Sequence, residues 1–396
     1  MLEGYYIVYN TLTKATILLD NSFYETLSKE GIIRLENNAS ENRRILRHMK
    51  HLKMLVDSSL TEREEINAAI QKIERSKMES DNFTIWLYLT YDCNFDCPYC
   101  MEQGNYKVDL SKSYMTSSTV EKIVDWTKLK MWENGCKRLS VVFFGGEPLL
   151  NLDMLLYACQ YIRSVFAGSN VLFQYSIVSN GYLLSKEIVD SLIKNDVNIY
   201  QITLDGPAEI HDKRRKCKDG SSSFSTILYN IKYMVNTYPQ KANCHVRMNL
   251  DKQNMDWIKQ LLLLLKNEDL QKKIVLTVGE VIENQNELDH VAKYSLSERE
   301  CLTALQGIYE FAFKNGFEIG NMRDMCSCNI MNKSWFMFDP YGNIYKCPSF
   351  VGTSHMAIGH VDRPHSLNQM FFDLKPWQQC EKCEFVSICG GGCVYK

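Results

Sequence analysis

The chain has 396 residues, of which 45% are hydrophobic and 23% charged, and its formal net charge is −2. Such a length allows two or three domains, and a near-neutral chain without a basic tail argues against nucleic acid or an anionic membrane as a partner. The first ten residues lack the pattern of a signal peptide, and the most apolar stretch, residues 257–267, is too short to span a bilayer. We therefore expect a cytoplasmic globular protein.

Residues 1–82 are predicted to be a separate N-terminal segment of mixed α and β structure. The sequence YYIVYNTLTKATILLD predicts two short strands around a Thr-Leu-Thr-Lys turn, and two helical patterns and a charged stretch follow it. This segment is either a small recognition domain or packing that covers the next domain.

Strands and helices alternate over residues 83–300. The predicted strands are 83–90, 139–144, 172–178, 199–204, 244–250 and 274–278, and the predicted helices lie near 118–134, 152–166, 184–195, 224–236 and 254–267. Six such units without hairpin signals predict an α/β fold with a parallel sheet and right-handed crossovers. The sheet is either open and doubly wound or closed in part as a barrel, and in both cases ligands bind at the carboxyl ends of its strands.

Fifteen cysteines are an unusual number for this chain. The number is odd and the chain has no export signal, so we expect a reducing cytosol and cysteines that bind metal. Ten of the fifteen fall in three groups, at residues 93–100, 326–347 and 380–393, whereas the other five are scattered. After about residue 300, cysteine, glycine and proline replace the strand–helix alternation, which predicts a third, cysteine-rich domain over 301–396.

The first group lies in YDCNFDCPYC, at Cys93, Cys97 and Cys100. Their i, i+4, i+7 spacing would suit one face of a helix, but Pro98 and the preceding strand favour a loop. Three thiols on a loop after a strand are a candidate ligand set. The spacing resembles the radical S-adenosylmethionine superfamily, with Tyr99 in the aromatic position at the cofactor, and implies a [4Fe–4S] cluster with one iron left open.

Further motifs carry the same resemblance along the next strands. Gly145 and Gly146 lack a Cβ and so allow close approach of the backbone, and with Glu147 they resemble the motif that holds the methionine ammonium of S-adenosylmethionine. The segment Ser179, Asn180 and Gly181 resembles the one that contacts the ribose. Arg247 either binds the carboxylate of the cosubstrate or pairs with a neighbouring carboxylate. The resemblance implies a partial (β/α)6 barrel over 83–300.

The C-terminal cysteines form a second pattern. Read alone, Cys380-x2-Cys383-x5-Cys389-x3-Cys393 would suit a four-cysteine zinc site. Preceded by Cys328-x13-Gly342-x4-Cys347, the arrangement resembles the SPASM extension, which carries one or two auxiliary [4Fe–4S] clusters. That resemblance implies Cys328, Cys347 and Cys393 at one cluster and Cys380, Cys383 and Cys389 at the other. Cys326 is either a further ligand or a spare thiol.

The SPASM pattern contains one more cysteine beyond the last group, whereas this chain ends at Lys396. The second auxiliary cluster would then have an open iron, or the chain is a fragment.

The resemblance implies that a reduced cluster cleaves S-adenosylmethionine to a 5′-deoxyadenosyl radical, which abstracts hydrogen from a substrate. It implies a precursor peptide as substrate and a one-electron reductant such as flavodoxin or ferredoxin. Sulfatase maturases carry an aspartate after the cysteine that matches Cys347, and here the residue is Pro348. We therefore favour a peptide maturase that forms a thioether or C–C crosslink. The alternatives are a sulfatase maturase, a peptide epimerase and a binding protein without enzymatic activity whose cysteines hold structural metal ions.

Overall fold

The computed structural model describes residues 4–10, 15–30, 40–55, 59–78, 80–100, 102, 113–281, 289–320, 328–380, 383 and 385–394. The chain divides into two compact units. The terminal unit contains Met1–Met78, Asn321–Cys328 and Lys375–Val394, and the barrel unit contains Glu79–Gly320, Asn329–Leu374 and Tyr395–Lys396. The division at 1–82, 83–300 and 301–396 stays a prediction.

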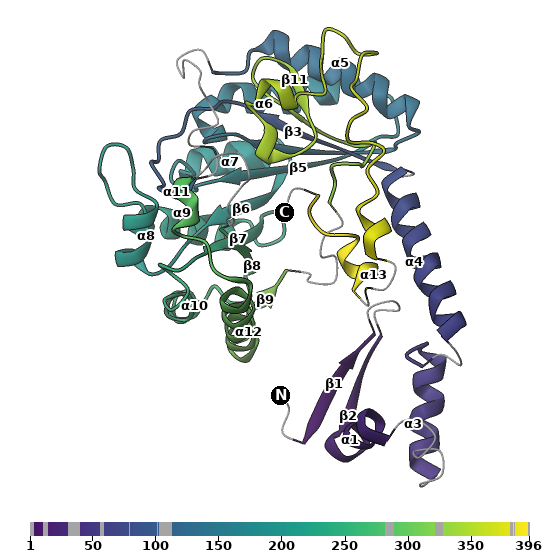
Figure 1. Cartoon of the computed structure of the whole chain (residues 1–396). Coiled ribbons are helices and arrows are strands. Elements are labelled where there is room, and N and C mark those ends of the chain that lie inside the picture. Colours follow the sequence, from purple (N-terminus) through teal and green to yellow (C-terminus); the bar gives the residue numbers. More distant parts are fainter. Residues whose placement is uncertain are drawn as a thin grey trace. The chain divides into compact units, whose positions relative to one another are not determined.

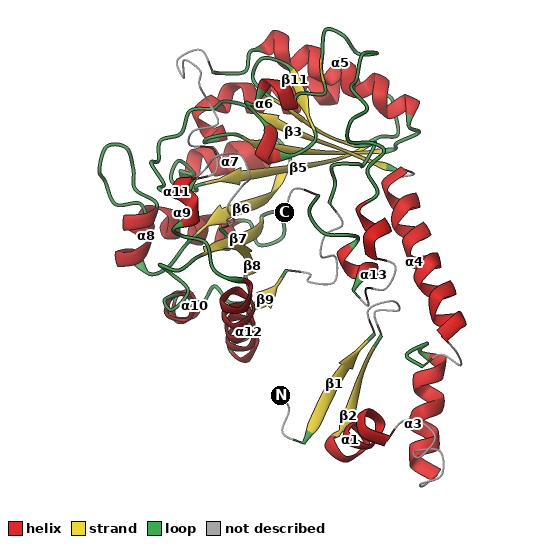
Figure 2. Cartoon of the chain, in the orientation of Figure 1, coloured by secondary structure: helices red, strands yellow, loops and turns green. Residues whose placement is uncertain are grey.

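Six parallel strands form the centre of the barrel unit (Figures 1 and 2). They are β3 (Asn82–Tyr88), β4 (Arg138–Phe144), β5 (Leu172–Ser179), β6 (Val197–Thr203), β7 (Asn243–Leu250) and β8 (Ile274–Glu280). Each pairs in parallel with the next, in chain order. This confirms the predicted α/β fold with the parallel sheet of a partial (β/α)6 barrel.

Helices lie along the outer side of this curved sheet (Figure 2). Those at the predicted positions are α5 (Ser117–Glu133), α6 (Leu152–Val165), α7 (Lys186–Lys194), α9 (Phe224–Thr237) and α10 (Ile258–Asn267). Those not predicted are α8 (Ala208–Arg214), α11 (Asp289–Ala292) and α12 (Glu298–Lys314). Alternate strand residues face the helices: Phe83, Ile85 and Leu87 of β3 are fully buried, and the Phe83 ring lies 6.4 Å from the Trp126 ring of α5.

The sheet of the barrel unit continues beyond the six strands. β10 (Trp335–Phe338) pairs in parallel with β3, and β11 (Asn343–Tyr345) and β12 (Gly359–His360) follow in antiparallel pairing. At the other edge, β9 (Glu318–Ile319) pairs in parallel with β8. The sequence did not predict this extension, because the apolar segment of β10 has no neighbouring helical pattern that would mark it as part of the barrel sheet. Short 3-10 turns occur at η2 (Pro148–Asn151), η4 (Pro348–Phe350) and η5 (Ser354–Met356).

The terminal unit has a core of its own. The predicted strands are present as β1 (Tyr5–Tyr9) and β2 (Thr16–Asp20), which pair antiparallel. The helical elements are α1 (Asn21–Glu30), α3 (Ser40–His51), α4 (Ser59–Met78), η6 (Pro376–Cys380) and α13 (Val386–Cys389). Leu19, Phe23, Leu46 and Met49 form a buried cluster. The charged stretch predicted after residue 60 lies in α4, where Glu74 accepts a hydrogen bond from Trp377 Nε1 at 3.0 Å.

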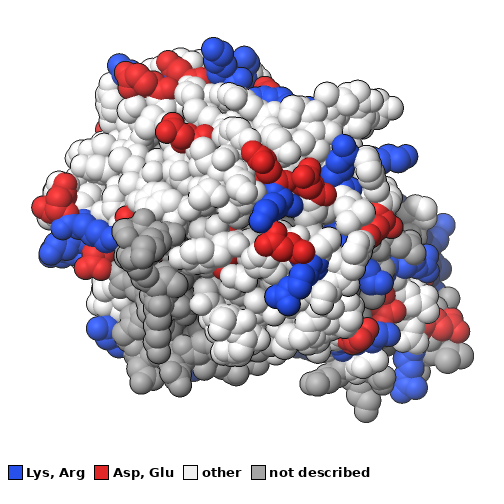
Figure 3. Space-filling model, turned by 90° about the horizontal axis from the view of Figure 1, so that it is seen from above, with Lys and Arg blue, Asp and Glu red and all other residues white. Residues whose placement is uncertain are grey.

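None of the helices that the structure describes combines the length and apolar character that crossing a bilayer requires. On the face that Figure 3 shows, lysine and arginine side chains lie among aspartate and glutamate side chains. This interspersed surface agrees with the formal net charge of −2.

Candidate cluster and cosubstrate site

A cavity of about 310 Å³ lies in the barrel unit at the carboxyl ends of its strands. The end of a parallel sheet is the expected place for a ligand in this class of fold. Residues from the loops after β3, β4 and β5 line the cavity together with residues of β6, β7 and β8. The predicted site residues among them are Cys93, Cys97, Tyr99, Cys100, Gly145, Gly146, Ser179, Asn180 and Arg247.

The cysteine loop, residues 91–100, follows β3 and contains no helical residue, as Pro98 and the preceding strand predict. A second loop, after α8, pairs with it. Asp96 N donates to Lys216 O at 2.8 Å, and Lys218 N donates to Asn94 O at 2.9 Å. This pairing fixes the loop so that Cys93, Cys97 and Cys100 all line the cavity.

The cysteine thiols of this loop lie in a buried environment. Burial raises the pKa of Cys93 to about 12 and that of Cys97 to about 11, because the low-dielectric surroundings disfavour the thiolate. The Phe95 N–H donates to Cys93 Sγ at 3.4 Å, and such bonds to sulfur are common in iron–sulfur sites. Thiols of this kind bind as thiolates once a metal compensates the negative charge.

Gly145 and Gly146 bring the loop after β4 against the cysteine loop. A Cβ at Gly145 would lie 2.2 Å from Thr90 O, and one at Gly146 would lie 2.2 Å from Asp92 O. The Gly146 N–H donates to Thr90 O at 3.0 Å, and the Glu147 N–H donates to Asp92 O at 2.9 Å. The two glycines are therefore required for contact with the backbone before the cysteines, a role that the sequence did not indicate.

Glu147 is fully buried and does not line the cavity in this structure. Its carboxylate accepts hydrogen bonds from Leu149 N at 3.1 Å, from Ser179 Oγ at 2.9 Å and from Asn180 N at 2.8 Å. Burial raises the pKa of Glu147 to about 7, and these hydrogen bonds oppose the shift. The carboxylate thus joins the loop after β4 to the loop after β5, and its contact with the methionine ammonium stays a prediction.

Asn180 connects the loop after β5 to the cysteine loop. Its Nδ2 donates to Asn94 Oδ1 at 2.7 Å and lies 4.0 Å from Cys93 Sγ. Ser179 and Asn180 both line the cavity, where the resemblance places the ribose of the cosubstrate.

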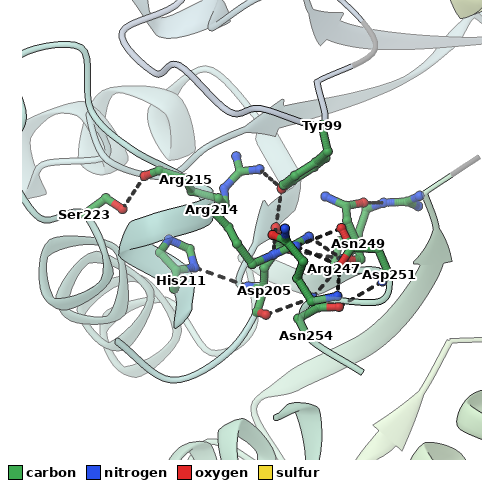
Figure 4. Close-up of polar contacts among 11 residues, drawn as sticks. Tyr99, Asp205, His211, Arg214, Arg215, Ser223, Arg247, Asn249, Asp251 and Asn254 are labelled. Atoms are coloured by element: carbon green, nitrogen blue, oxygen red, sulfur yellow. Dashed lines mark hydrogen bonds and ion pairs between the residues drawn. The ribbon is translucent and has the colours of Figure 1, made fainter. Parts of the chain in front are cut away.

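Tyr99 belongs to a buried polar network (Figure 4). Its hydroxyl donates to Asp205 Oδ2 and accepts a hydrogen bond from Arg215 Nη1 at 2.8 Å. The other carboxylate oxygen of Asp205 accepts from the Asn249 N–H at 2.8 Å. The network therefore joins the cysteine loop to the segments after β6 and within β7.

Arg214 and Asp251 complete this network. Arg214 Nη1 lies 2.8 Å from both oxygens of the Asp251 carboxylate, and the Arg214 guanidinium lies 4.6 Å from the centre of the Tyr99 ring. Both side chains are buried, so this ion pair is screened little by water.

Arg247 extends from β7 across β8. Its Nε donates to Asn249 Oδ1 at 2.8 Å, and a Cβ at Gly279 would lie 1.8 Å from one of its guanidinium nitrogens. Gly279 therefore provides the space for this side chain. Burial lowers the pKa of Arg247 from its usual value, and the assignment of Arg247 to the cosubstrate carboxylate stays a prediction.

The structure adds cavity residues to which the sequence assigned no role. Glu102 is buried, and neither of its carboxylate oxygens has a hydrogen-bond partner among the described residues. Arg215, from the charged segment DKRRK at residues 212–216, also lines the cavity. Thr203, Asn249, Glu280 and Ser349 are further lining residues. Thr203, Asn249 and Glu280 lie at the carboxyl ends of β6, β7 and β8, which is the one local signal that could have identified any of these residues.

The predicted ligands of auxiliary clusters are distributed over both units. Cys347 belongs to the barrel unit and follows β11, whereas Cys328 and Cys393 belong to the terminal unit, so their common site stays a prediction. Cys326 lies outside the described residues. Cys380, Cys383 and Cys389 lie together in the terminal unit: the Cys383 N–H donates to Cys380 O at 2.9 Å.

The electrostatics of the terminal unit support this grouping. Burial raises the pKa of Cys380, and the charges of Cys383 and Cys389 raise it further. Among the described residues, no group of three or more histidine, cysteine, aspartate or glutamate residues is arranged to hold a single metal ion.

Comparison with known proteins identifies the class. Residues 87–265 match the family model of the Radical SAM superfamily. The chain therefore contains a radical SAM domain and is an enzyme, as the cysteine loop and the motifs after it predict.

Three similar proteins cover most of the chain. A cysteine-type anaerobic sulfatase-maturating enzyme of Clostridium novyi is 23% identical over 76% of this chain and 85% of its own. The structure of anSMEcpe with bound AdoMet and the Kp18Cys peptide has a TM-score of 0.61 at 19% identity and covers 79% of this chain and 89% of that chain. The structure of Streptococcus suis SuiB bound to precursor peptide SuiA has a TM-score of 0.56 at 16% identity and covers 98% of this chain and 92% of that chain. The two structures show that the fold is shared.

Enzymes of the radical SAM superfamily use S-adenosylmethionine and a [4Fe–4S] cluster, and the cavity described above fits both groups. It gathers three cysteines, the ligand type that such clusters take. It also contains buried polar atoms that have no hydrogen-bond partner among the described residues, namely Arg215 Nε and both carboxylate oxygens of Glu102. The cysteine-rich C-terminal region fits auxiliary clusters in the same way.

Proposed function

We propose that the chain is a peptide maturase that abstracts hydrogen from a ribosomally made precursor peptide and forms a thioether or C–C crosslink. The observation that carries this proposal is the cavity, in which three cysteine ligands and unpaired polar groups meet at the carboxyl ends of the strands. S-adenosylmethionine, when bound at a reduced cluster, supplies the 5′-deoxyadenosyl radical for this chemistry.

The residues of the chain position the reacting groups. Cys93, Cys97 and Cys100 would hold the cluster, and Ser179 and Asn180 would contact the ribose of the cosubstrate. Within the residues that the structure describes, Arg215 Nε has no hydrogen-bond partner, so that Arg215 as well as Arg247 could bind a carboxylate.

The residue after Cys347 favours a crosslinking maturase over a sulfatase maturase. The segment after Cys347 is the 3-10 turn η4, which begins at Pro348, and Ser349 lines the cavity. Pro348 has no acid or base function, whereas the sulfatase maturases that resemble this chain carry an aspartate there. A crosslink also needs an acceptor for the second electron, and an auxiliary cluster held by the C-terminal cysteines would take this electron from the substrate radical. A flavodoxin- or ferredoxin-like protein would supply the first electron.

Sulfatase maturation is the second candidate, because the Clostridium novyi relative is a sulfatase-maturating enzyme. Mass spectrometry separates the two. The chain is co-expressed with the short reading frame beside its gene, or with a peptide that contains a sulfatase cysteine motif. We expect loss of two hydrogens per modification in the precursor only, and modification of the sulfatase peptide alone would contradict the proposal. An unchanged precursor mass with altered stereochemistry would indicate epimerisation.

We further propose that the β1–β2 hairpin binds the leader part of the precursor by strand addition. Ile7 and Leu18 pair across the hairpin, and both are more than half exposed. An exposed apolar pair on a two-stranded sheet suits an extended peptide. Ile7→Asp should weaken precursor binding in a fluorescence anisotropy assay, whereas Leu302→Asp, on the exposed side of α12, should leave it unchanged. Equal binding by both variants would contradict strand addition.

A further inference from the structure

Two consecutive arginines at the carboxyl end of α8, Arg214 and Arg215, have different surroundings. Arg214 is paired with Asp251 through two contacts of 2.8 Å. Arg215 is buried as well, but no carboxylate among the described residues forms an ion pair with it. Its Nη1 donates to the Tyr99 hydroxyl at 2.8 Å, and no residue in the described part of the chain bonds to its Nε. Arg215 therefore brings a positive charge into the cavity that no direct ion pair neutralises.

This charge acts on the cysteine ligand set. Arg215 lines the same cavity as Cys93, Cys97 and Cys100. Its Nη1 donates to the hydroxyl of Tyr99, which lies between Cys97 and Cys100 in the cysteine loop. Because Arg215 is buried, its charge acts on the ligand set through a medium of low dielectric constant. The electrostatic potential that Arg215 creates at these sulfur atoms is therefore positive.

Tyr99 fixes Arg215 relative to the ligand set. Tyr99 lies between Cys97 and Cys100 in the sequence, and its hydroxyl is oriented by donation to Asp205. Arg215 also stacks on the loop, with its guanidinium 5.7 Å from the centre of the Phe95 ring. Figure 4 shows Arg215 at the Tyr99 hydroxyl and Arg247 beside Asn249. The position of the charge is thus set by the cysteine loop itself.

We propose that Arg215 tunes the reduction potential of the cluster held by Cys93, Cys97 and Cys100, by stabilising its reduced form. This inference rests on the proposed function, because it requires that cluster. One-electron reduction adds one negative charge to the cluster, and the electron comes from a low-potential one-electron donor. A fixed positive charge nearby in a medium of low dielectric constant stabilises the added charge. Net charge and hydrogen bonds near a cluster are known determinants of its potential.

The test is a redox titration of the reconstituted full-length enzyme in the absence of S-adenosylmethionine. The signal of the reduced cluster is measured by electron paramagnetic resonance at each potential. The signal is assigned by its loss in a Cys93→Ala variant. Arg215→Gln should lower the equilibrium constant for reduction by about tenfold, which corresponds to about 59 mV for a one-electron couple. Arg215→Lys, which keeps the charge, should recover most of the wild-type potential.

Arg247→Gln is the matched control, because Arg247 is an arginine of the same cavity whose Nε donates to Asn249 of β7 and not to the cysteine loop. The reduction potential of the cluster in this variant should stay near that of the wild type. If Arg215→Gln does not fold, Tyr99→Phe serves instead. This variant keeps the Arg215 charge but removes the hydroxyl that accepts its hydrogen bond, so we expect a smaller decrease in the reduction potential.

An unchanged potential in Arg215→Gln, or in Tyr99→Phe where the former does not fold, would overturn the inference. A decrease of the same size in Arg247→Gln would also overturn it. These results leave the proposed function intact, since that function is read from the modified peptide. A wild-type protein without any cluster at Cys93, Cys97 and Cys100 would overturn both.

Discussion

At the scale of single residues, the site depends on buried charges whose partners come from distant parts of the sequence. Arg214 pairs with Asp251, 37 residues away, and Tyr99 bonds to Asp205, 106 residues away. A buried ion pair contributes modest net stability, but removal of one partner leaves an unpaired charge in a low-dielectric environment. Such pairs therefore fix the loops around the cavity.

Arg214→Gln should lower the free energy of unfolding by about 3–5 kcal/mol, because it leaves the Asp251 carboxylate buried without its cation. Urea denaturation of the metal-free protein measures this change. The double variant Arg214→Gln with Asp251→Asn should recover part of the loss. Simple addition of the two single losses would show that the pair is not coupled.

Glu147→Gln should lower the free energy of unfolding by about 1–3 kcal/mol. The amide can accept from only one side, so that one of the donors Leu149 N and Asn180 N loses its acceptor. Thermal unfolding of the metal-free protein provides the measurement, and Glu133→Gln on the exposed side of α5 is the control. A variant as stable as the wild type would mean that these hydrogen bonds do not hold the two loops together.

At the scale of elements, the cysteine loop is positioned by its neighbours. Gly145 and Gly146 contact the backbone of Thr90 and Asp92, and the loop after α8 pairs with Asn94 and Asp96. The three cysteines thus reach one cavity because two other βα loops support the segment that carries them.

Gly146→Ala should displace the cysteine loop, because the added Cβ would lie 2.2 Å from Asp92 O. We expect lower stability by about 2 kcal/mol or more and a reduced iron content after anaerobic reconstitution. Gly307→Ala in α12 is the matched control. Its Cβ meets only the end of the Lys259 side chain at 3.3 Å, and alanine favours a helix by about 1 kcal/mol. Equal iron content in both variants would contradict the role of Gly146.

The same elements show what the sequence could and could not predict. The six strands and five of the helices were predictable because burial on alternate residues and helical periodicity are local patterns. The cysteine loop was predictable because Pro98 excludes a helix there. The pairing of β10 with β3 was not, since it joins segments about 250 residues apart. The network of Tyr99, Asp205 and Arg215 was missed for the same reason, because partners that meet only in the folded chain leave no local pattern.

At the scale of the whole molecule, the cysteines separate into a set in the barrel unit and a set in the terminal unit. Cys93, Cys97 and Cys100 line the cavity of the barrel unit, and Cys380, Cys383 and Cys389 lie together in the terminal unit. If each set holds its own cluster, loss of one set should leave the other loaded.

The triple variant Cys380→Ser, Cys383→Ser and Cys389→Ser should therefore bind less iron, by one cluster per chain. It should still cleave S-adenosylmethionine when reduced, because the ligand set of the barrel unit is intact. Iron and sulfide analysis with quantification of 5′-deoxyadenosine tests this. Unchanged iron content would show that these cysteines are not ligands.

The most direct test of the account as a whole is the yield of 5′-deoxyadenosine from the reconstituted enzyme with S-adenosylmethionine, a one-electron reductant and the precursor peptide. The account predicts 5′-deoxyadenosine in proportion to a peptide product lighter by two hydrogens, and neither product from the variant with Cys93, Cys97 and Cys100 changed to alanine. Peptide modification by that variant, or no 5′-deoxyadenosine from the iron-loaded wild type, would contradict it.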